Sequence, residues 1–294
     1  MISIIITSFR EPGTVGRAIE AFLQQRIKER YGLIVAAPDK ETLDVARRYQ
    51  KKYKQIKLFK DPGKGKSYAL NLLLPKVKGR ILILSDGDVF VGKNSISELL
   101  KVFEDKKVGC ATGQPVSLDN RNTLFGYWSH LQCYVLHKIR ERRAKRKQFL
   151  ECSGYLWAFR NGIIKSFPRD VAEDTIIPAF FWLEGWEIAY APNALVYVKF
   201  PSNLCDFIEQ KKRTAKGHES LYKYVNKKFP RMKSFRNELL ESWQLFCFPK
   251  NIKEIFWTLL LFPLRLYVWL LVFWHIKIKR QPYIDGWKRV ESTK

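Results

Sequence analysis

The 294-residue chain has few cysteines and histidines, and neither residue type is arranged as in a disulfide framework or a zinc site. The five cysteines are odd in number and scattered, with no C-x-x-C pair, so we expect reduced thiols in a cytosolic setting. The four histidines do not cluster with cysteines, which argues against a histidine-ligated metal. The first residues lack the basic and long apolar regions of a secretory signal, so we expect the N-terminal domain on the cytoplasmic side.

Acidic residues are scarce relative to basic ones. The chain has 53 Lys and Arg against 28 Asp and Glu, a formal net charge of +25. Such a charge predicts an anionic partner, which can be nucleic acid, a phosphorylated small molecule or membrane headgroups. Apolar residues make up 46% and aromatic residues 14% of the chain, which argues against disorder and allows one large domain or two small ones.

Short β-branched runs alternate with helical patterns over the N-terminal third of the chain. This alternation is typical of an α/β fold with a doubly wound, mainly parallel sheet and flanking helices. Ligands of such sheets bind at the carboxyl ends of the strands, where residues 7–11 and 86–88 fall. We expect strands at 2–6, 33–35, 56–58 and 81–84, and helices near 14–25, 42–52 and 67–74.

Two carboxylates, Asp86 and Asp88, follow the strand predicted at 81–84. Paired hard oxygen ligands suit Mg²⁺ or Mn²⁺, which keep several waters and take further ligands from a diphosphate. Upstream, the glycine- and lysine-rich segment 61–67 leads into a helix and offers backbone N–H groups and positive charge to phosphates. It is not a Walker A loop, because the spacing G-x-x-x-x-G-K-[ST] is absent. Either segment taken alone also fits an ordinary turn.

Two later segments carry candidate chemistry. Glu173 and Asp174 precede a group of aromatic residues, and a carboxylate near an acceptor hydroxyl can act as a general base. An acidic pair of this kind also suits the N-terminus of a helix. Gln210 and Arg213 lie in a basic run, where a guanidinium can bind a diphosphate in bidentate fashion. Without context, that run is equally a basic helix.

Taken together and in this order, these residues resemble the inverting family-2 glycosyltransferases with the GT-A fold. The resemblance is to the membrane-attached subgroup that includes cellulose-synthase-like enzymes, and it runs from Ile2 to about Gly217. It rests on five pieces: the strand ending in residues 7–11, Gly63 to Asn71, Gly79 to Asp88, residues 172–175, and the run from Gly185 to Arg213.

The resemblance implies a metal-dependent transferase that uses a nucleotide sugar. It implies that Asp88 binds the metal, Mn²⁺ or Mg²⁺, with Asp86 near the metal or the ribose of the donor. Asp174, with Glu173 beside it, is implied as the catalytic base. Gln210 and Arg213 match the first and fourth positions of the family's Q-x-x-R-W signature, at the acceptor and the diphosphate. The further residues that we expect to contact the donor are Ser8, Glu11, Asp39 and Lys66.

Two positions depart from the family's pattern. The aspartate pair after the second strand is replaced by the residues V-A-A-P-D at 35–39, so the acid that contacts the nucleobase is missing unless Asp39 substitutes. The choice between a GDP- and a UDP-sugar therefore stays open. Thr214 replaces the signature's tryptophan, which removes a stacking surface and argues against polymer synthesis. We expect transfer of one hexose to a lipid-linked saccharide or a lipid phosphate. Mannose and glucose are the hexoses to test first.

An apolar run at 255–276 is long enough to cross a hydrocarbon core of about 30 Å. Pro263 and Arg265 oppose a simple span, and the basic residues on both flanks favour two cytoplasmic ends. Three arrangements stay open: interfacial or re-entrant helices broken at Pro263, a single span, and a buried core helix. We expect a catalytic domain at 1–245 and a membrane-attachment region at 246–294, with membrane lipids as partners.

A second amphipathic helix is expected from residue 124 to 139, and it runs into seven basic residues at 138–148. These residues form either a solvated helix end or a contact for anionic headgroups.

Two other functions are compatible with the chain as a whole. One is a nucleotidyltransferase that makes a nucleotide sugar. The other is a non-catalytic basic protein that binds membranes or nucleic acid, although no nucleic-acid module is present and nucleic acid is therefore a disfavoured partner.

Overall fold

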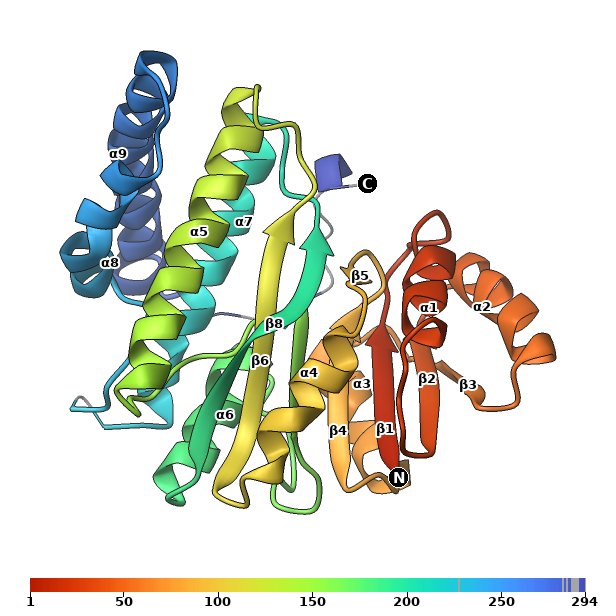
Figure 1. Cartoon of the computed structure of the whole chain (residues 1–294). Coiled ribbons are helices and arrows are strands. Elements are labelled where there is room, and N and C mark those ends of the chain that lie inside the picture. Colours follow the sequence, from red (N-terminus) through yellow and green to blue (C-terminus); the bar gives the residue numbers. More distant parts are fainter. Residues whose placement is uncertain (227, 282, 284, 287–290, 294) are drawn as a thin grey trace.

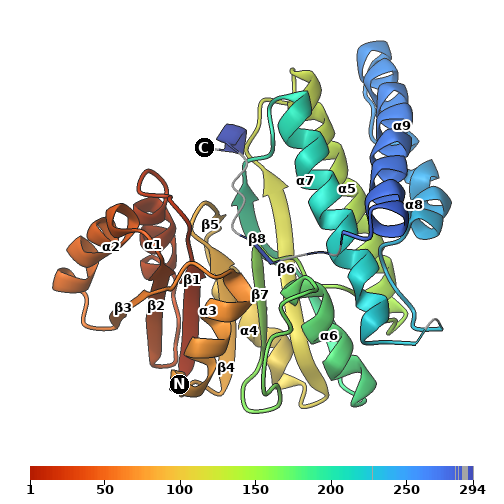
Figure 2. The same ribbon diagram turned by 180° about the vertical axis from the view of Figure 1, so that it is seen from behind.

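The computed structural model describes residues 1–226, 228–281, 283, 285–286 and 291–293. In this part of the chain one mixed sheet has helices on both faces, as Figures 1 and 2 show from opposite sides. The strands are β1 (Ile2–Thr7), β2 (Tyr31–Ala37), β3 (Ile56–Lys60), β4 (Ile81–Asp86), β5 (Phe90–Val91), β6 (Val108–Ser117), β7 (Leu156–Arg160) and β8 (Glu187–Val198). The α-helices are α1 (Val15–Leu23), α2 (Lys40–Lys52), α3 (Lys66–Leu73), α4 (Ser95–Lys101), α5 (Leu124–Lys145), α6 (Glu173–Leu183), α7 (Leu204–Glu219), α8 (Phe235–Glu241) and α9 (Ile252–Phe273).

The strand order within the sheet is β3-β2-β1-β4-β7-β6-β8-β5. Strands β1, β2, β3 and β4 all run parallel to one another, as the alternation of strand and helix patterns predicts. They are rich in β-branched and aliphatic residues because helices cover both faces of this part of the sheet. Beyond β4 the sheet is mixed: β7 is antiparallel to β4 and β6, whereas β8 is parallel to β6. The predicted α/β class with a mainly parallel N-terminal sheet is confirmed.

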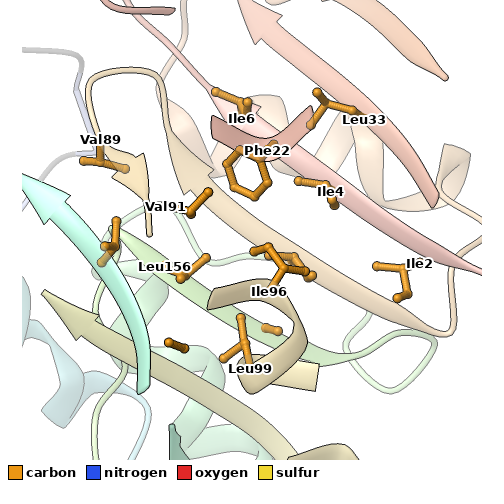
Figure 3. Close-up of a cluster of buried hydrophobic side chains, with 14 of the residues drawn as sticks. Ile2, Ile4, Ile6, Phe22, Leu33, Val89, Val91, Ile96, Leu99 and Leu156 are labelled. Carbon is orange, nitrogen blue, oxygen red and sulfur yellow. The ribbon is translucent and has the colours of Figure 1, made fainter. Parts of the chain in front are cut away.

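Two hydrophobic cores lie on opposite faces of the sheet. Alternate residues of β1 divide between them, since successive side chains of a strand point to opposite faces. Ile2, Ile4 and Ile6 pack with Phe22 of α1 and Ile96 of α4, as Figure 3 shows. Ile5 faces the other core, which contains buried side chains of α3 and α6. Burial on both faces fixes the register of the strands and so the position of their carboxyl ends.

Helices α5 and α7 lie beside the sheet, and α8 and α9 form a further layer outside them (Figure 1). Three contacts attach the first half of α9 to α5 and the loop before it: Arg121 pairs with Glu254, the hydroxyl groups of Tyr127 and Thr258 lie 2.6 Å apart, and Trp128 Nε1 donates to the carbonyl oxygen of Trp257 at 2.7 Å. The second half packs on α7 through Val268 and Val272.

Helix α9 continues through Pro263, so the alternative of two short helices broken at this residue is wrong. A proline in a helix removes one backbone hydrogen bond. Here Leu261 packs into the cluster with α5, and Val268 and Val272 pack against α7, so tertiary contacts hold both halves of the helix in line.

The outer face of α8 and α9 is apolar and exposed. Among the described residues, 252–278 form one helix that is long and apolar enough to cross a membrane, and 22% of its most apolar window is buried within the protein. The alternative of a buried core helix is therefore wrong. We call the following exposed side chains the apolar surface: Leu239, Leu240, Trp243, Phe246, Ile255, Phe256, Leu259, Leu266, Leu270 and Phe273.

Some basic side chains at the end of α5 are exposed and others are buried. Lys145 and Lys147 are exposed, whereas Arg140 is 1% exposed. Arg143 turns back to the carbonyl oxygens of Phe149 and Arg231. The seven basic residues at 138–148 are therefore not a uniform solvated surface, and one of them belongs to the interior of the protein.

Candidate active site

The carboxyl ends of β1 and β4 meet at the edge of the sheet, as the parallel topology requires. Thr7 and Asp86 are register partners, and Thr7 Oγ1 donates to Asp86 Oδ1 at 3.2 Å. Between Asp86 and Asp88, a Cβ atom added to Gly87 would lie 2.3 Å from Ser8 Oγ. The turn between the two aspartates therefore passes against β1 only with glycine at this position.

Lys66, the first residue of α3, joins the two acidic segments. Its Nζ lies 2.6 Å from Asp86 Oδ1 and 2.8 Å from Glu173 Oε1. Burial opposes the charge of Lys66, but the two carboxylates outweigh it and raise the pKa of the ammonium well above its usual value. Burial also opposes the charge of Glu173, but Lys66 lowers the pKa of Glu173 overall. Lys66 and Glu173 are therefore both charged at neutral pH.

Asp174 begins α6 beside Glu173. Its Oδ2 accepts a hydrogen bond from the backbone N–H of Gly154 at 2.8 Å. Burial, and then the negative charge of Glu173, raise the pKa of the Asp174 carboxyl. A raised pKa makes this carboxylate a better proton acceptor than an exposed aspartate.

A cavity of about 500 Å³ opens over these groups. It brings together most of the residues predicted from the sequence, which come from segments far apart in the chain: Glu11, Lys66, Asp86, Asp88, Glu173, Asp174, Gln210 and Arg213. The proximity of the two acidic pairs and the Q-x-x-R residues thus follows from the fold.

Two predicted donor contacts, Ser8 and Asp39, lie outside the lining of this cavity. Ser8 is buried, and its hydroxyl donates to Glu11 Oε2 at 2.6 Å, so it holds a residue that does line the cavity. Asp39 is the N-cap of α2, where Oδ1 accepts from the backbone N–H of Thr42 at 2.9 Å. Its Oδ2 accepts from the backbone N–H of Arg10 at 2.7 Å. Both oxygens of Asp39 therefore have backbone donors at the end of β2.

No cluster of three or more potential metal-binding residues of the His, Cys, Asp and Glu types occurs within the described part of the chain. Asp86 and Asp88 together supply hard oxygen atoms on one side of the cavity. This pair fits a Mg²⁺ or Mn²⁺ ion that takes its remaining ligands from water and a diphosphate, and does not fit an ion enclosed by protein ligands alone.

A buried ionic cluster, missed in the sequence, lies behind Asp174. Glu151 is fully buried, and its carboxylate lies 3.0 Å from His218 Nδ1 and 3.7 Å from Lys233 Nζ. Burial opposes the charge, but His218 and Lys233 lower the pKa of Glu151 to about 2. Thr175, next to Asp174, also contacts His218. Glu151 lies 67 positions before His218 and 82 positions before Lys233, and this spacing carries no signal.

After α9 the chain crosses α7 (Figure 2), and its described residues Tyr283 and Asp285 line the cavity. Tyr283 packs on Gly217, and Asp285 Oδ2 accepts a hydrogen bond from the backbone N–H of Ser67 at 2.5 Å. The glycine-rich segment that we expected to face phosphates therefore binds a carboxylate of the chain itself. Burial, and then Glu173, raise the pKa of Asp285. No motif at these two residues predicts the contact.

Sequence comparison links this chain to known enzymes. It is 25% identical over 241 residues to the probable glycosyltransferase YdaM of Bacillus subtilis, a match that covers 78% of this chain and 56% of the relative. It is 21% identical over 228 residues to a poly-beta-1,6-N-acetyl-D-glucosamine synthase of Staphylococcus epidermidis, covering 75% of this chain and 55% of the relative. The chain thus spans about half the length of these relatives.

Solved structures share the fold. A mannosyltransferase of Pyrobaculum calidifontis, solved with GDP-Man and Mn²⁺, superposes with a TM-score of 0.68 at 16% identity, over 95% of this chain and 87% of that one. TarS of S. aureus in complex with UDP-GlcNAc gives a TM-score of 0.50 at 13% identity, over 84% and 81% of the chains. These neighbours confirm the GT-A fold. The family model described as glycosyltransferase like family 2 matches residues 1–217, so the chain belongs to the family-2 glycosyltransferases, as the sequence motifs predict.

Proposed function

We propose that this glycosyltransferase transfers one hexose from a GDP- or UDP-sugar to a lipid-linked saccharide or lipid phosphate, with inversion, at the cytoplasmic face of a membrane. One observation carries the proposal: a single cavity holds both acidic pairs and continues to residues of α8 and α9. The neighbouring enzymes were solved with GDP-Man and with UDP-GlcNAc, which supports both nucleotides as candidates. Mannose and then glucose are the sugars to test first.

Each charged group at the strand ends has a role in donor binding. Asp86 and Asp88 would hold Mn²⁺ or Mg²⁺, which when bound neutralises the charge that grows on the leaving diphosphate. Arg213 offers a guanidinium to the same diphosphate, and Gln210 lies beside it on α7. Lys66 keeps Asp86 and Glu173 in place through its two ion pairs. Glu173 is therefore a positioning residue in this proposal.

Asp174 is the proposed base. The oxygen of an acceptor hydroxyl bonds to the anomeric carbon while the bond from that carbon to the diphosphate breaks, and the hydroxyl proton passes to Asp174. The backbone N–H of Gly154 fixes Oδ2 at 2.8 Å and so orients the carboxylate. An acceptor that attacks through a phosphate oxygen needs no such proton transfer, so dependence on Asp174 distinguishes a saccharide acceptor from a lipid phosphate.

Attachment to the membrane is proposed to be interfacial. Helix α9 is docked on α5 and α7 along its length, which leaves the apolar surface as the face that meets lipid. A groove beside Trp243 is lined by four basic residues and by Glu141, and this excess of positive charge suits anionic headgroups. The basic residues are Lys138, Arg142, Lys145 and Arg146. The apolar surface includes Leu239 and Leu240 of α8, so its residues lie on both sides of the proposed boundary at 245/246.

The direct test is thermal stabilisation of detergent-purified protein by a panel of GDP- and UDP-sugars, with Mn²⁺, with Mg²⁺ and with EDTA. A ligand that binds the native state raises its stability, by about 2.7 kcal/mol at 100 times its Kd. We expect one nucleotide to stabilise the protein only with metal, and Asp88→Ala to abolish the effect. If a nucleotide sugar still stabilised the protein in EDTA and in the Asp88→Ala variant, the metal-dependent mechanism would be refuted.

A further inference from the structure

The cavity has a second end, where three cationic side chains line it together with Glu238 and Glu241 of α8. Its acidic side chains at the strand ends come from β4, the following turn, α6 and the returning chain. Toward α8 and α9, the same cavity is lined by Arg140 of α5, Lys211 of α7 and Arg265 of α9. Three helices thus bring positive charges to one place that the proposed mechanism does not use.

Two of these cations have a hydrogen-bond donor that the described part of the protein leaves unused. Arg140 is 1% exposed and its Nε donates to the carbonyl oxygen of Glu151 at 3.3 Å, but its Nη1 is buried without a hydrogen-bond partner among the described residues. Arg265 pairs with Glu238 at 2.5 and 2.7 Å through Nε and Nη2, whereas its Nη1 also lacks a partner in that part of the chain. Buried polar groups without partners are costly, so a bound ligand that accepts these hydrogen bonds would stabilise the site.

Lys211 of α7 lies close enough to Arg265 to be affected by its charge. Its Nζ donates to Gln132 and lies 5.3 Å from the ring of Phe207. Burial, and then the nearby charge of Arg265, lower the pKa of Lys211 to about 7. Glu238 opposes this effect in part. A lysine in such a site regains its proton when an anion binds beside it.

Apolar side chains also line the cavity toward α8 and α9. Leu245, Leu261 and Trp269 line the same end of the cavity, and they belong to the η4 segment (Ser242–Cys247) and to α9, the elements that carry the apolar surface. An anion bound here would thus have apolar side chains beside it, on the elements that carry the apolar surface. A nucleotide would place its polar base and ribose against these residues, whereas an apolar chain would bury surface there.

We propose that Arg140, Lys211 and Arg265 bind the phosphate of a lipid-borne acceptor, with its apolar chain directed along Leu245, Leu261 and Trp269. This inference rests on the proposed function and names the part of the acceptor that the protein recognises. The acidic end of the cavity then receives the donor, and the acceptor enters from the side of α8 and α9.

The test uses dodecyl phosphate as the probe, with dodecanol and inorganic phosphate as the two comparison ligands. Binding to the detergent-purified full chain is measured by tryptophan fluorescence, since Trp269 lines the site. We expect dodecyl phosphate to bind at least tenfold more tightly than either comparison ligand. We expect Lys211→Met to weaken that binding by about tenfold or more. Lys212→Met is the matched control, because Lys212 pairs with Glu209 on the same helix and does not line the cavity.

The outcomes separate this inference from the proposed function. Equal binding of dodecyl phosphate by wild type and Lys211→Met would overturn the inference, as would equal binding of dodecanol. Binding of inorganic phosphate as tight as that of dodecyl phosphate would identify a site for free phosphate and overturn the lipid assignment. Binding of dodecyl phosphate that depends on Lys211, in a protein that binds no nucleotide sugar, would refute the proposed function and leave the phosphate site standing.

A measurement on the wild-type protein covers the case in which Lys211→Met does not fold. Calorimetric titration with dodecyl phosphate at pH 8, in two buffers of different ionisation enthalpy, reports protons taken up on binding. The groups that act on Lys211 are Cys133 of α5, Lys233 before α8, Glu238 of α8 and Arg265 of α9. We expect net proton uptake, because the bound dianion raises the pKa of Lys211. Binding without proton uptake would contradict a site built on Lys211.

Discussion

The ammonium group of Lys66 lies 2.8 Å from the carboxylate of Glu173, although the two residues are 107 positions apart. The same ammonium lies 2.6 Å from Asp86, so one lysine connects the end of β4 to the start of α6. The acidic segments that the family motifs place in separate parts of the sequence are thus held together by one buried cation. This relationship fixes the position of the proposed base relative to the proposed metal ligands.

Lys66→Met should therefore destabilise the protein and abolish donor binding. The side chains of Lys66 and Glu173 are 11% and 9% exposed, and loss of one partner leaves a buried charge unpaired, at a cost of about 3 kcal/mol or more. The free energy of unfolding in urea and the Kd for the nucleotide sugar measure the two effects. Lys64→Met, an exposed lysine of the same loop, is the control and should change neither quantity.

Asp174→Asn should lower transfer to a saccharide acceptor by about 10²- to 10⁴-fold, the usual contribution of a general base. Nucleotide-sugar binding should persist, because Asp86, Asp88 and Lys66 are unchanged. The wild-type rate should fall as the pH is lowered through the pKa of Asp174, since the base acts in its deprotonated form. Burial and Glu173 raise this pKa above 3.8, so the fall should begin at a higher pH than for an ordinary aspartate. An undiminished rate in Asp174→Asn would exclude this residue as the base.

Glu151→Gln should lower the free energy of unfolding relative to wild type at neutral pH. At pH 2 the difference between the two proteins should be small. Glu151 has a pKa of about 2 in the folded protein, against 4.5 as the reference value, so its ionisation stabilises the fold above pH 4.5. That stabilisation, about 3 kcal/mol, is lost as the pH falls from 4.5 to 2. The urea midpoints of wild type and variant should therefore converge on acidification. A constant difference between them would contradict the pairing of Glu151 with His218 and Lys233.

Asp285→Ala should tighten binding of nucleoside diphosphates. The carboxylate of Asp285 accepts from the backbone N–H of Ser67 at the start of α3, a position that favours any anion. Its removal frees this donor for a phosphate, and we expect the Kd for GDP or UDP with Mn²⁺ to fall about two- to tenfold. Asp170→Ala removes an exposed carboxylate that pairs with Lys223 outside the cavity, and it should leave the Kd unchanged.

Leu240→Glu should weaken binding to vesicles that contain anionic lipid. Leu240 is 62% exposed within the apolar surface, so a charge there opposes insertion into the interface. Cosedimentation should show a loss of several-fold. Leu183→Glu is the control. Leu183 belongs to α6, away from α8 and α9, and is 56% exposed, so this change should have no effect on vesicle binding. Equal losses in both variants would argue against the apolar surface as the attachment face.

The sequence predicts those parts of the fold that depend on local patterns. The alternation of β-branched and helical segments predicts β1 to β4 and their helices, and the parallel topology then places Asp86 beside Thr7. The family motifs predict Asp174 and Arg213 as site residues, since both occupy motif positions in the sequence. The lining of one cavity by Gln210 and Asp88 requires the packing of α7 against the sheet and is seen only in the structure.

Other features have no local signal. The helix through Pro263 depends on tertiary packing that offsets one missing hydrogen bond. Arg140 lies within a run of basic residues, and only the direction of its helix face places it in the interior. The contact of Asp285 with Ser67 joins positions 218 residues apart, so no periodicity or spacing predicts it.

Turnover of the donor tests the central claim most directly. The protein is incubated with an α-linked nucleotide sugar and a lipid-linked acceptor, and the anomeric proton signals are followed by NMR with Mn²⁺ removed before each spectrum. Our account predicts loss of the donor signal only in reactions with divalent metal, and a β-linked product that forms in wild type but not in Asp88→Ala. An α-linked product, or turnover that is unchanged in EDTA, would contradict a metal-dependent inverting transferase.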